Sequence, residues 1–237
     1  MNRIQIVLLT IIGAGLWACS SVSPLYVQTD KIEVNTSTQK DSVLASFIEP
    51  YRDSLALEME RVIAYASDDF INKRPVGALG NFVVDQTMQY VVNKQLVQRD
   101  DYICIMNFGG LRAPINKGNV KVGDIYKLMP FDNTIVLLKL PAKRISDIES
   151  YLRNSGGEPV GGFQLTNDSF ELNSNKELND TLFVITTDYL ANGGDRMNFF
   201  KNSYEKINTG IFLRDILLEM VEKKDTLVSY VDERIKL

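Results

Sequence analysis

Met106-Asn107-Phe108-Gly109-Gly110-Leu111-Arg112 follows an apolar run, 102–106, that is typical of a buried strand. Asn107 therefore stands at a strand end, directly before a Gly-Gly turn and Arg112. Two adjacent glycines let the backbone approach a ligand closely, and a guanidinium two residues later is a planar, permanently charged donor suited to phosphate. The stretch predicts a ligand-facing strand end; the alternative is a plain hairpin turn with a solvated Arg112.

Length and composition favour one soluble globular domain with extensions. The chain has 237 residues, of which 45% are hydrophobic and 24% are charged, so a sizeable core is expected and a polytopic membrane protein is not. The formal net charge of −4 argues against nucleic acid as a partner, because that binding needs a basic surface.

The N-terminus is typical of a secretory signal. Met1-Asn2-Arg3 is a short basic start, residues 4–16 are mostly apolar, and the run closes at Cys19. Its end resembles a bacterial lipobox, which predicts a lipoprotein signal peptide over 1–18, lipidation of Cys19, and an extracytoplasmic protein anchored to a bacterial membrane, most simply on the periplasmic side. A plain signal peptide with an incidental cysteine is the alternative. We expect residues 19–48 to form a tether and arm, and 49–237 to form the folded domain.

Cysteine and histidine usage restricts the chemistry. Beyond Cys19 the sequence has only Cys104, in the middle of the apolar run, so we expect a buried thiol and no disulfide. The sequence contains no histidine, the residue on which zinc, two-metal, serine-triad and Cys–His chemistries nearly all depend. No Asp or Glu cluster has ligand spacing either. We therefore expect no cofactor, no metal site and no catalytic residue in this chain.

Periodicity predicts helices and strands in alternation, with hairpins between some of them. Expected helices cover 50–61, with Pro50 in the first turn, 80–96, a turn within 119–128, 142–154 and 209–221, the last capped by Thr209. Expected strands cover 25–28, 31–34, 62–65, 102–106, 134–140, 162–166 and 182–187, and 167–179 is expected to be a polar hairpin region. The pattern predicts a mixed α/β (α+β) fold without a purely parallel, doubly wound sheet.

Four motifs form an ordered series along the chain. They are Leu79-Gly80-Asn81-Phe82, the stretch from Asn107 to Arg112, Pro130-Phe131-Asp132-Asn133, and Tyr189-Leu190-Ala191-Asn192-Gly193-Gly194-Asp195. Over about residues 50–237 the series resembles the C-terminal domain of 5′-nucleotidases, including the bacterial UDP-sugar hydrolases. The resemblance implies layered sheets covered by helices and a nucleotide-specificity pocket. In that family a separate N-terminal metallophosphoesterase domain carries two metal ions and the catalytic residues.

The resemblance also implies roles for single residues. Asn107 matches the residue that hydrogen-bonds the base, and Arg112 matches the one that reaches ribose or phosphate oxygens. Phe131 and Tyr189 match two rings that sandwich the base, and Asp195 matches the acid that accepts from the ribose hydroxyls. Taken alone, each has a simpler interpretation: the rings as core aromatics, Asp195 as a helix cap and Arg112 as a solvated side chain.

Further residues complete the implied substrate-binding set. They are the turn residues Gly109, Gly110, Asn192, Gly193 and Gly194, with Arg74 as a candidate second arginine before the Leu-Gly-Asn motif. The sequence departs from the family pattern at Phe108, which replaces a glycine, and at Val76 and Arg196.

The implied function is substrate recognition for a 5′-nucleotidase-type hydrolase, in nucleotide catabolism or salvage. Catalysis would need a separate metallophosphoesterase as partner, and the divalent metals would belong to that protein. This chain alone would be inactive. Two alternatives stay open: a non-catalytic lipoprotein that captures nucleosides, and a structural envelope protein whose pocket has decayed.

Overall fold

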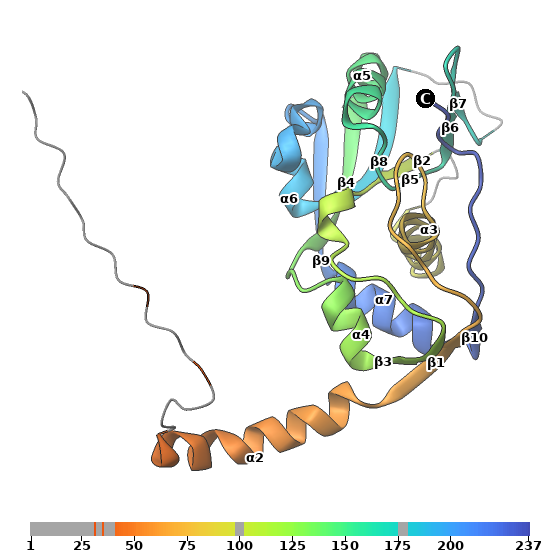
Figure 1. Cartoon of the computed structure of the whole chain (residues 1–237). Helices are drawn as coiled ribbons and strands as arrows, with labels where there is room; N and C mark the ends of the chain where they lie inside the picture. Colours follow the sequence, from red (N-terminus) through yellow and green to blue (C-terminus); the bar gives the residue numbers. More distant parts are fainter. Residues whose placement is uncertain (1–30, 32–34, 36–40, 98–101, 175–179) are drawn as a thin grey trace, which may run out of the picture. The chain divides into compact units, whose positions relative to one another are not determined.

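The computed structural model describes residues 31, 35, 41–97, 102–174 and 180–237 (Figure 1). The chain divides into two units, Met1–Ser46 and Phe47–Leu237. The signal segment, Cys19 and the strands expected at 25–28 and 31–34 lie outside the described residues, apart from Lys31, and stay predictions. Within the described part of the chain, no helix is long and apolar enough to cross a membrane.

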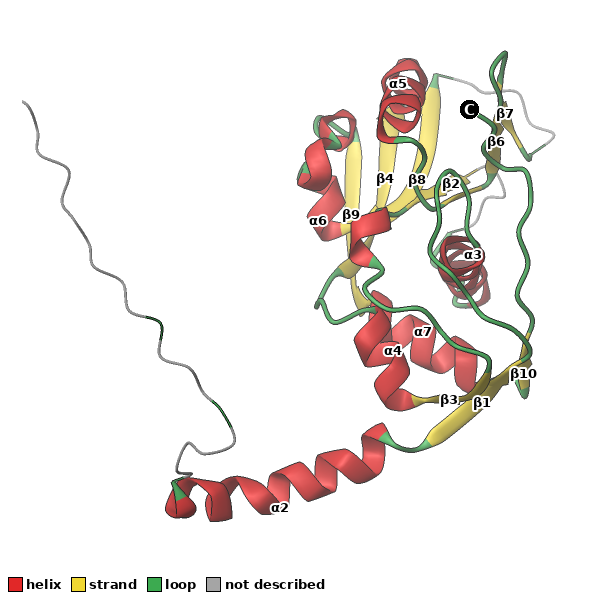
Figure 2. Ribbon diagram, viewed as in Figure 1, coloured by secondary structure: helices red, strands yellow, loops and turns green. Residues whose placement is uncertain are grey.

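The helices and strands follow one another in the mixed order that periodicity predicts (Figure 2). The helices are α2 (Ser42–Met59), α3 (Ala78–Asn93), α4 (Val122–Leu128), α5 (Ile145–Ser155), α6 (Asp188–Ala191) and α7 (Leu213–Glu222). The strands are β1 (Val62–Ala66), β2 (Tyr102–Ile105), β3 (Gly118–Lys121), β4 (Thr134–Pro141), β5 (Val160–Gly161), β6 (Phe163–Leu165), β7 (Phe170–Leu172), β8 (Thr181–Thr187), β9 (Glu205–Phe212) and β10 (Thr226–Leu227).

A five-stranded mixed sheet, in the order β5-β2-β8-β4-β9, is the centre of the domain. β2 runs parallel to β8, whereas β5, β4 and β9 each run antiparallel to their neighbours. A smaller sheet, β10-β1-β3, and the hairpin β6-β7 complete the architecture. The predicted mixed α/β class with several sheets is confirmed.

The strands β2, β4 and β8 send alternate side chains into two different cores, because successive residues of a strand point to opposite faces. Cys104 and Ile185 are buried on the face covered by α3 and α7. Ile103 and Val184 are buried on the other face, with side chains from α5 and α6. Burial on both faces explains why β2, β4 and β8 read as continuous apolar runs in the sequence.

The helix predicted over 209–221 is wrong at its start. Residues 205–212 form β9, which pairs with β4 along the edge of the sheet, and the helix α7 begins only at Leu213. Thr209 does not cap a helix; its Oγ1 donates a hydrogen bond to the carbonyl oxygen of Ile135, 2.7 Å away. Pairing with β9 satisfies backbone N–H and C=O groups along the edge of β4, which would have no strand partner if residues 205–212 were helical.

Pro50 is not in a first turn either, because α2 begins eight residues earlier and holds Pro50 in its interior. The Asp41 side chain caps the true N-terminus: its Oδ1 accepts the backbone N–H groups of Val43 and Leu44 at 2.9 and 3.0 Å. No side chain of α2 is buried. The apolar spacing thus predicted the helix but not its start.

Near the C-terminus, Arg234 clamps the chain to α3 and β5. Its guanidinium donates to Asp85 at 3.0 Å, to Asp232 at 2.7 Å and to the carbonyl oxygen of Val160 at 2.8 Å. The Arg234 side chain is only 10% exposed, so these charge-assisted bonds are shielded from water.

Replacing this cation should destabilise the protein. Arg234→Met leaves two partly buried carboxylates without their cation, so the free energy of unfolding should fall by roughly 2–3 kcal/mol, allowing for the partial exposure of the partners. The control is Lys236→Met, which removes an exposed ion pair with Glu233 at 2.5 Å and should change the free energy of unfolding by less than about 0.5 kcal/mol. Urea unfolding followed by circular dichroism measures the stability of both variants. Equal losses of stability in the two would contradict the role of Arg234.

Candidate functional site

The topology brings three of the four motifs to one edge of the large sheet. β2 and β8 are parallel, so Asn107, just after β2, and Tyr189, just after β8, lie at the same edge. β4 runs the opposite way, with Ile135 opposite Thr187, so the loop that carries Phe131 into β4 reaches the same edge. Strand order alone therefore brings together residues that are far apart in the sequence, such as Asn107 and Tyr189.

A cavity of about 360 Å³ opens where these motifs meet. It is lined by Asn107, Gly109, Gly110, Arg112, Phe131, Asn133, Tyr189 and Asp195, all of which except Asn133 belong to the set that the sequence predicts. Phe131 is 42% exposed and Tyr189 is 46% exposed, so neither ring is a core aromatic. Exposed aromatic rings beside a few polar groups are typical of small-molecule sites.

The Asp195 carboxylate links the two Gly-Gly turns. Its Oδ2 accepts a hydrogen bond from Asn107 Nδ2 at 2.6 Å, and its Oδ1 accepts one from the Tyr189 hydroxyl at 2.8 Å. The second bond holds the pKa of Tyr189 above its usual value. A carboxylate has about four acceptor sites, so these two bonds leave capacity for hydroxyl groups of a ligand.

The backbone around Asp195 adopts a conformation that non-glycine residues rarely take. The φ angles are +91° at Gly193, +50° at Asp195 and +65° at Arg196. Tyr151 helps to hold the turn, because its hydroxyl donates to the Asp195 carbonyl oxygen at 3.0 Å. Burial raises the pKa of Tyr151 to about 12, so this hydroxyl keeps its proton at neutral pH.

Three predicted site residues of the second turn do not line the cavity. Asn192 faces Lys206, whose Nζ donates to its Oδ1 at 2.8 Å. A Cβ atom on Gly194 would come within 2.4 Å of the Tyr189 ring, so only glycine lets this ring lie against the turn. Gly193 supplies the left-handed backbone. Their predicted contact with a ligand therefore stays a prediction.

The first turn is close-packed on one side and open on the other. A Cβ atom on Gly110 would lie 2.6 Å from Asn107 Oδ1, whereas one on Gly109 would find its nearest neighbours at 3.9 and 4.0 Å. Arg112 is exposed, and its Nη1 donates to the Gly109 carbonyl oxygen at 3.1 Å. The turn therefore presents one cation and an open backbone to the cavity.

Arg74, the candidate second arginine, does not line the cavity. Its guanidinium donates to Glu158 and to the carbonyl oxygen of Ser155, each at 2.6 Å, and lies 4.7 Å from the centre of the Phe108 ring. Sequence reasoning missed Glu158, whose burial raises its pKa, because nothing in its surroundings marks it. It also missed Asn133 as a lining residue, although Asn133 ends the Pro-Phe-Asp-Asn motif.

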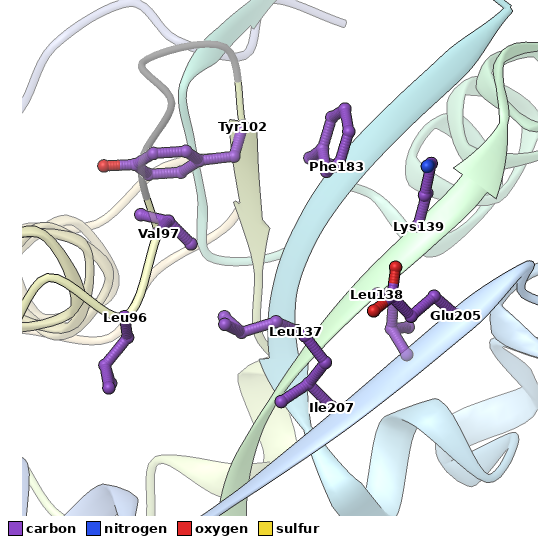
Figure 3. A pocket seen from close by; sticks show the side chains of 9 residues that line it. All are labelled: Leu96, Val97, Tyr102, Leu137, Leu138, Lys139, Phe183, Glu205 and Ile207. Atoms are coloured by element: carbon purple, nitrogen blue, oxygen red, sulfur yellow. The ribbon is translucent and has the colours of Figure 1, made fainter.

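A second cavity, of about 320 Å³, lies on one face of the large sheet (Figure 3). Its lining is Leu96, Val97, Tyr102, Leu137, Leu138, Lys139, Phe183, Glu205 and Ile207, and it includes none of the predicted site residues. This lining is mainly apolar, whereas amide, carboxylate, guanidinium and aromatic groups converge in the first cavity. We therefore take the first cavity as the candidate site.

Comparisons with known proteins agree with the resemblance that the sequence predicts. Residues 62–156 match the family model described as "5'-nucleotidase, C-terminal domain". A trifunctional nucleotide phosphoesterase of Bacillus subtilis is 29% identical over 184 residues, which are 67% of this chain and 12% of that protein. The 5′-nucleotidase of Mus musculus is 24% identical over 245 residues, which cover 86% of this chain and 42% of the relative.

Solved structures share the fold. A 5′-nucleotidase precursor from Thermus thermophilus superposes with a TM-score of 0.67 at 24% identity, over 82% of this chain and 43% of that one. An NAD nucleotidase from Haemophilus influenzae gives a TM-score of 0.62 at 17% identity, over 83% and 41% of the two chains. The family-model match and these relatives confirm the resemblance to the 5′-nucleotidase C-terminal domain family that the sequence predicts. This chain spans less than half the length of each of these relatives.

The packing of the first turn can be tested with adjacent glycines. Gly110→Ala places a methyl group against Asn107 and must displace its amide from Asp195, so the free energy of unfolding should fall by about 1–3 kcal/mol. Gly109→Ala places its methyl group at ordinary van der Waals distance from Asn107 and Asp195, 3.9 and 4.0 Å, and should cost less than about 0.5 kcal/mol. Urea unfolding measures both variants, and an equal loss in the two would contradict the proposed packing.

Proposed function

We propose that this chain recognises the nucleotide or nucleoside substrate of a 5′-nucleotidase-type phosphoester hydrolase whose metal-dependent step belongs to a separate metallophosphoesterase. The observation that carries the proposal is the cavity at the edge of the large sheet, where two exposed rings stand beside the Asn107–Asp195 pair. Similarity to the 5′-nucleotidase C-terminal domain family supports the same substrate class.

The two rings supply most of the expected affinity. Phe131 and Tyr189 offer flat apolar faces to a base, and stacking contributes roughly 1–3 kcal/mol per base with little dependence on which base it is. Asn107 would bind the edge of the base. Because association itself costs several kcal/mol, we expect dissociation constants in roughly the high micromolar to millimolar range.

The charged side chains would bind the sugar and the phosphate of the ligand. Asp195 would accept hydrogen bonds from ribose hydroxyls, and the exposed Arg112 would donate to phosphate or ribose oxygens. One anion and one cation at opposite turns suit a ligand with a hydroxyl-bearing sugar and a single phosphate. The pocket is therefore suited to orienting a substrate.

Bond cleavage is assigned to the partner because this sequence has no histidine to serve as metal ligand or base. Lipidation at Cys19 would hold the chain at a bacterial membrane, outside the cytoplasm, where nucleotide salvage from the surroundings begins. Without such a partner, the same pocket would make the chain a nucleoside-binding lipoprotein, so co-purification with a metallophosphoesterase distinguishes the two proposals.

Ligand binding depends on the exposed rings. Isothermal titration calorimetry with adenosine and AMP should detect weak binding to the wild type, and Phe131→Ala should weaken both by about tenfold or more through lost stacking. Tyr204→Ala removes an exposed ring outside the cavity and should leave binding unchanged. Failure of the wild type to bind either ligand would favour a structural protein with a decayed pocket.

The purified chain alone should not hydrolyse AMP. Release of inorganic phosphate should stay at background with added Mg²⁺, Mn²⁺ or Zn²⁺, because the recognition residues offer no metal-activated water. A complete 5′-nucleotidase assayed in parallel serves as the positive control. Robust metal-dependent hydrolysis by this chain would exclude the division of labour between two proteins.

A further inference from the structure

Phe108, between two residues that line the cavity, is held on three sides. Its backbone N–H donates to Glu158 Oε2 at 2.6 Å, and its carbonyl oxygen accepts from Asn72 Nδ2 at 3.0 Å. Its ring packs under the Arg74 guanidinium at 4.7 Å. These contacts limit the movement of Phe108.

Glu158 is the buried member of this cluster. Its side chain is 3% exposed, and its second oxygen accepts from Arg74 Nη2 at 2.6 Å. A buried carboxylate is costly unless it is paired and hydrogen-bonded, and here one oxygen binds a cation while the other binds the turn. The pairing that makes this buried carboxylate tolerable therefore also anchors the first Gly-Gly turn.

We infer that Glu158 and Arg74 are positioning residues that fix the turn Phe108–Gly110, and with it Asn107, in its ligand-binding geometry without touching the ligand. This inference rests on the proposed function for its effect on binding. Arg74 is turned to Glu158 and to the Ser155 carbonyl oxygen, which accepts from its Nη1 at 2.6 Å. A turn fixed in advance loses less freedom when a ligand binds, and this raises affinity.

Amide hydrogen exchange measured by NMR tests the positioning itself, in the free protein. Glu158→Gln keeps the shape of the side chain but removes its charge and one acceptor, so exchange at Phe108 and Gly110 should become at least about tenfold faster. Arg74→Gln leaves the Glu158–Phe108 bond in place and should give a smaller acceleration. Unchanged exchange in Glu158→Gln would overturn the inference.

The control is Glu149→Gln, which removes an i,i+4 pair with Arg153 at 2.7 Å on α5. Its exchange at Phe108 and Gly110 should match the wild type. If Glu158→Gln does not fold, Arg74→Gln decides the question, because unchanged exchange in that variant would equally overturn the positioning role.

Calorimetry distinguishes positioning from direct contact with phosphate. If Arg74 only positions the turn, Arg74→Gln should weaken the binding of adenosine and of AMP by the same factor. If Arg74 instead contacted the phosphate, the substitution would weaken the binding of AMP alone, and that result would overturn the inference. If the wild type binds neither compound, the proposed function fails, while hydrogen exchange still decides whether the turn is held by Glu158.

Discussion

Parallel pairing of β2 with β8 is the constraint on which the rest of the site depends. Ile103 lies opposite Val184 and Cys104 opposite Ile185, so the two strands end at one edge of the sheet. Each strand is followed by a Gly-Gly turn, and the antiparallel β4 brings its preceding loop to the same edge. Burial of both sheet faces fixes this register, because a slip by one residue would exchange the side chains of the two cores.

The charged residues at this edge of the sheet fall into two pairs, one that lines the cavity and one that lies behind the first turn. Asp195 and Arg112 line the cavity with opposite charges, whereas Glu158 and Arg74 neutralise one another behind the turn. The Glu158–Arg74 pair is partly shielded from water. Away from water a charge-assisted hydrogen bond is stronger, and the loss of one partner costs more free energy. Two arginines that look equivalent in the sequence therefore have different surroundings and, we propose, different tasks.

The sequence predicted those parts of the structure that depend on local pattern. The strands at 102–106, 134–140 and 182–187 were recognisable because both of their faces are buried. Seven of the eight residues that line the cavity were predicted from the ordered motifs. Residues 209–212 were misassigned because a buried helix follows them directly and its apolar spacing extends back into β9. Their strand conformation depends on pairing with β4, which lies far away in the sequence.

Glu158 could not have been found in this way. Its importance comes from a contact with Phe108, 50 residues away, and only the packed structure reveals it. The same holds for Tyr151, which supports Asp195 from α5. Residues that touch a ligand tend to lie in motifs, whereas those that hold them depend on tertiary packing.

The most direct test of the account is a crystal structure of the chain soaked with AMP. The account predicts the base between Phe131 and Tyr189, its edge at Asn107, and the ribose hydroxyls at Asp195. Density for the base in the apolar cavity on the face of the sheet, or at a surface away from both Gly-Gly turns, would contradict it.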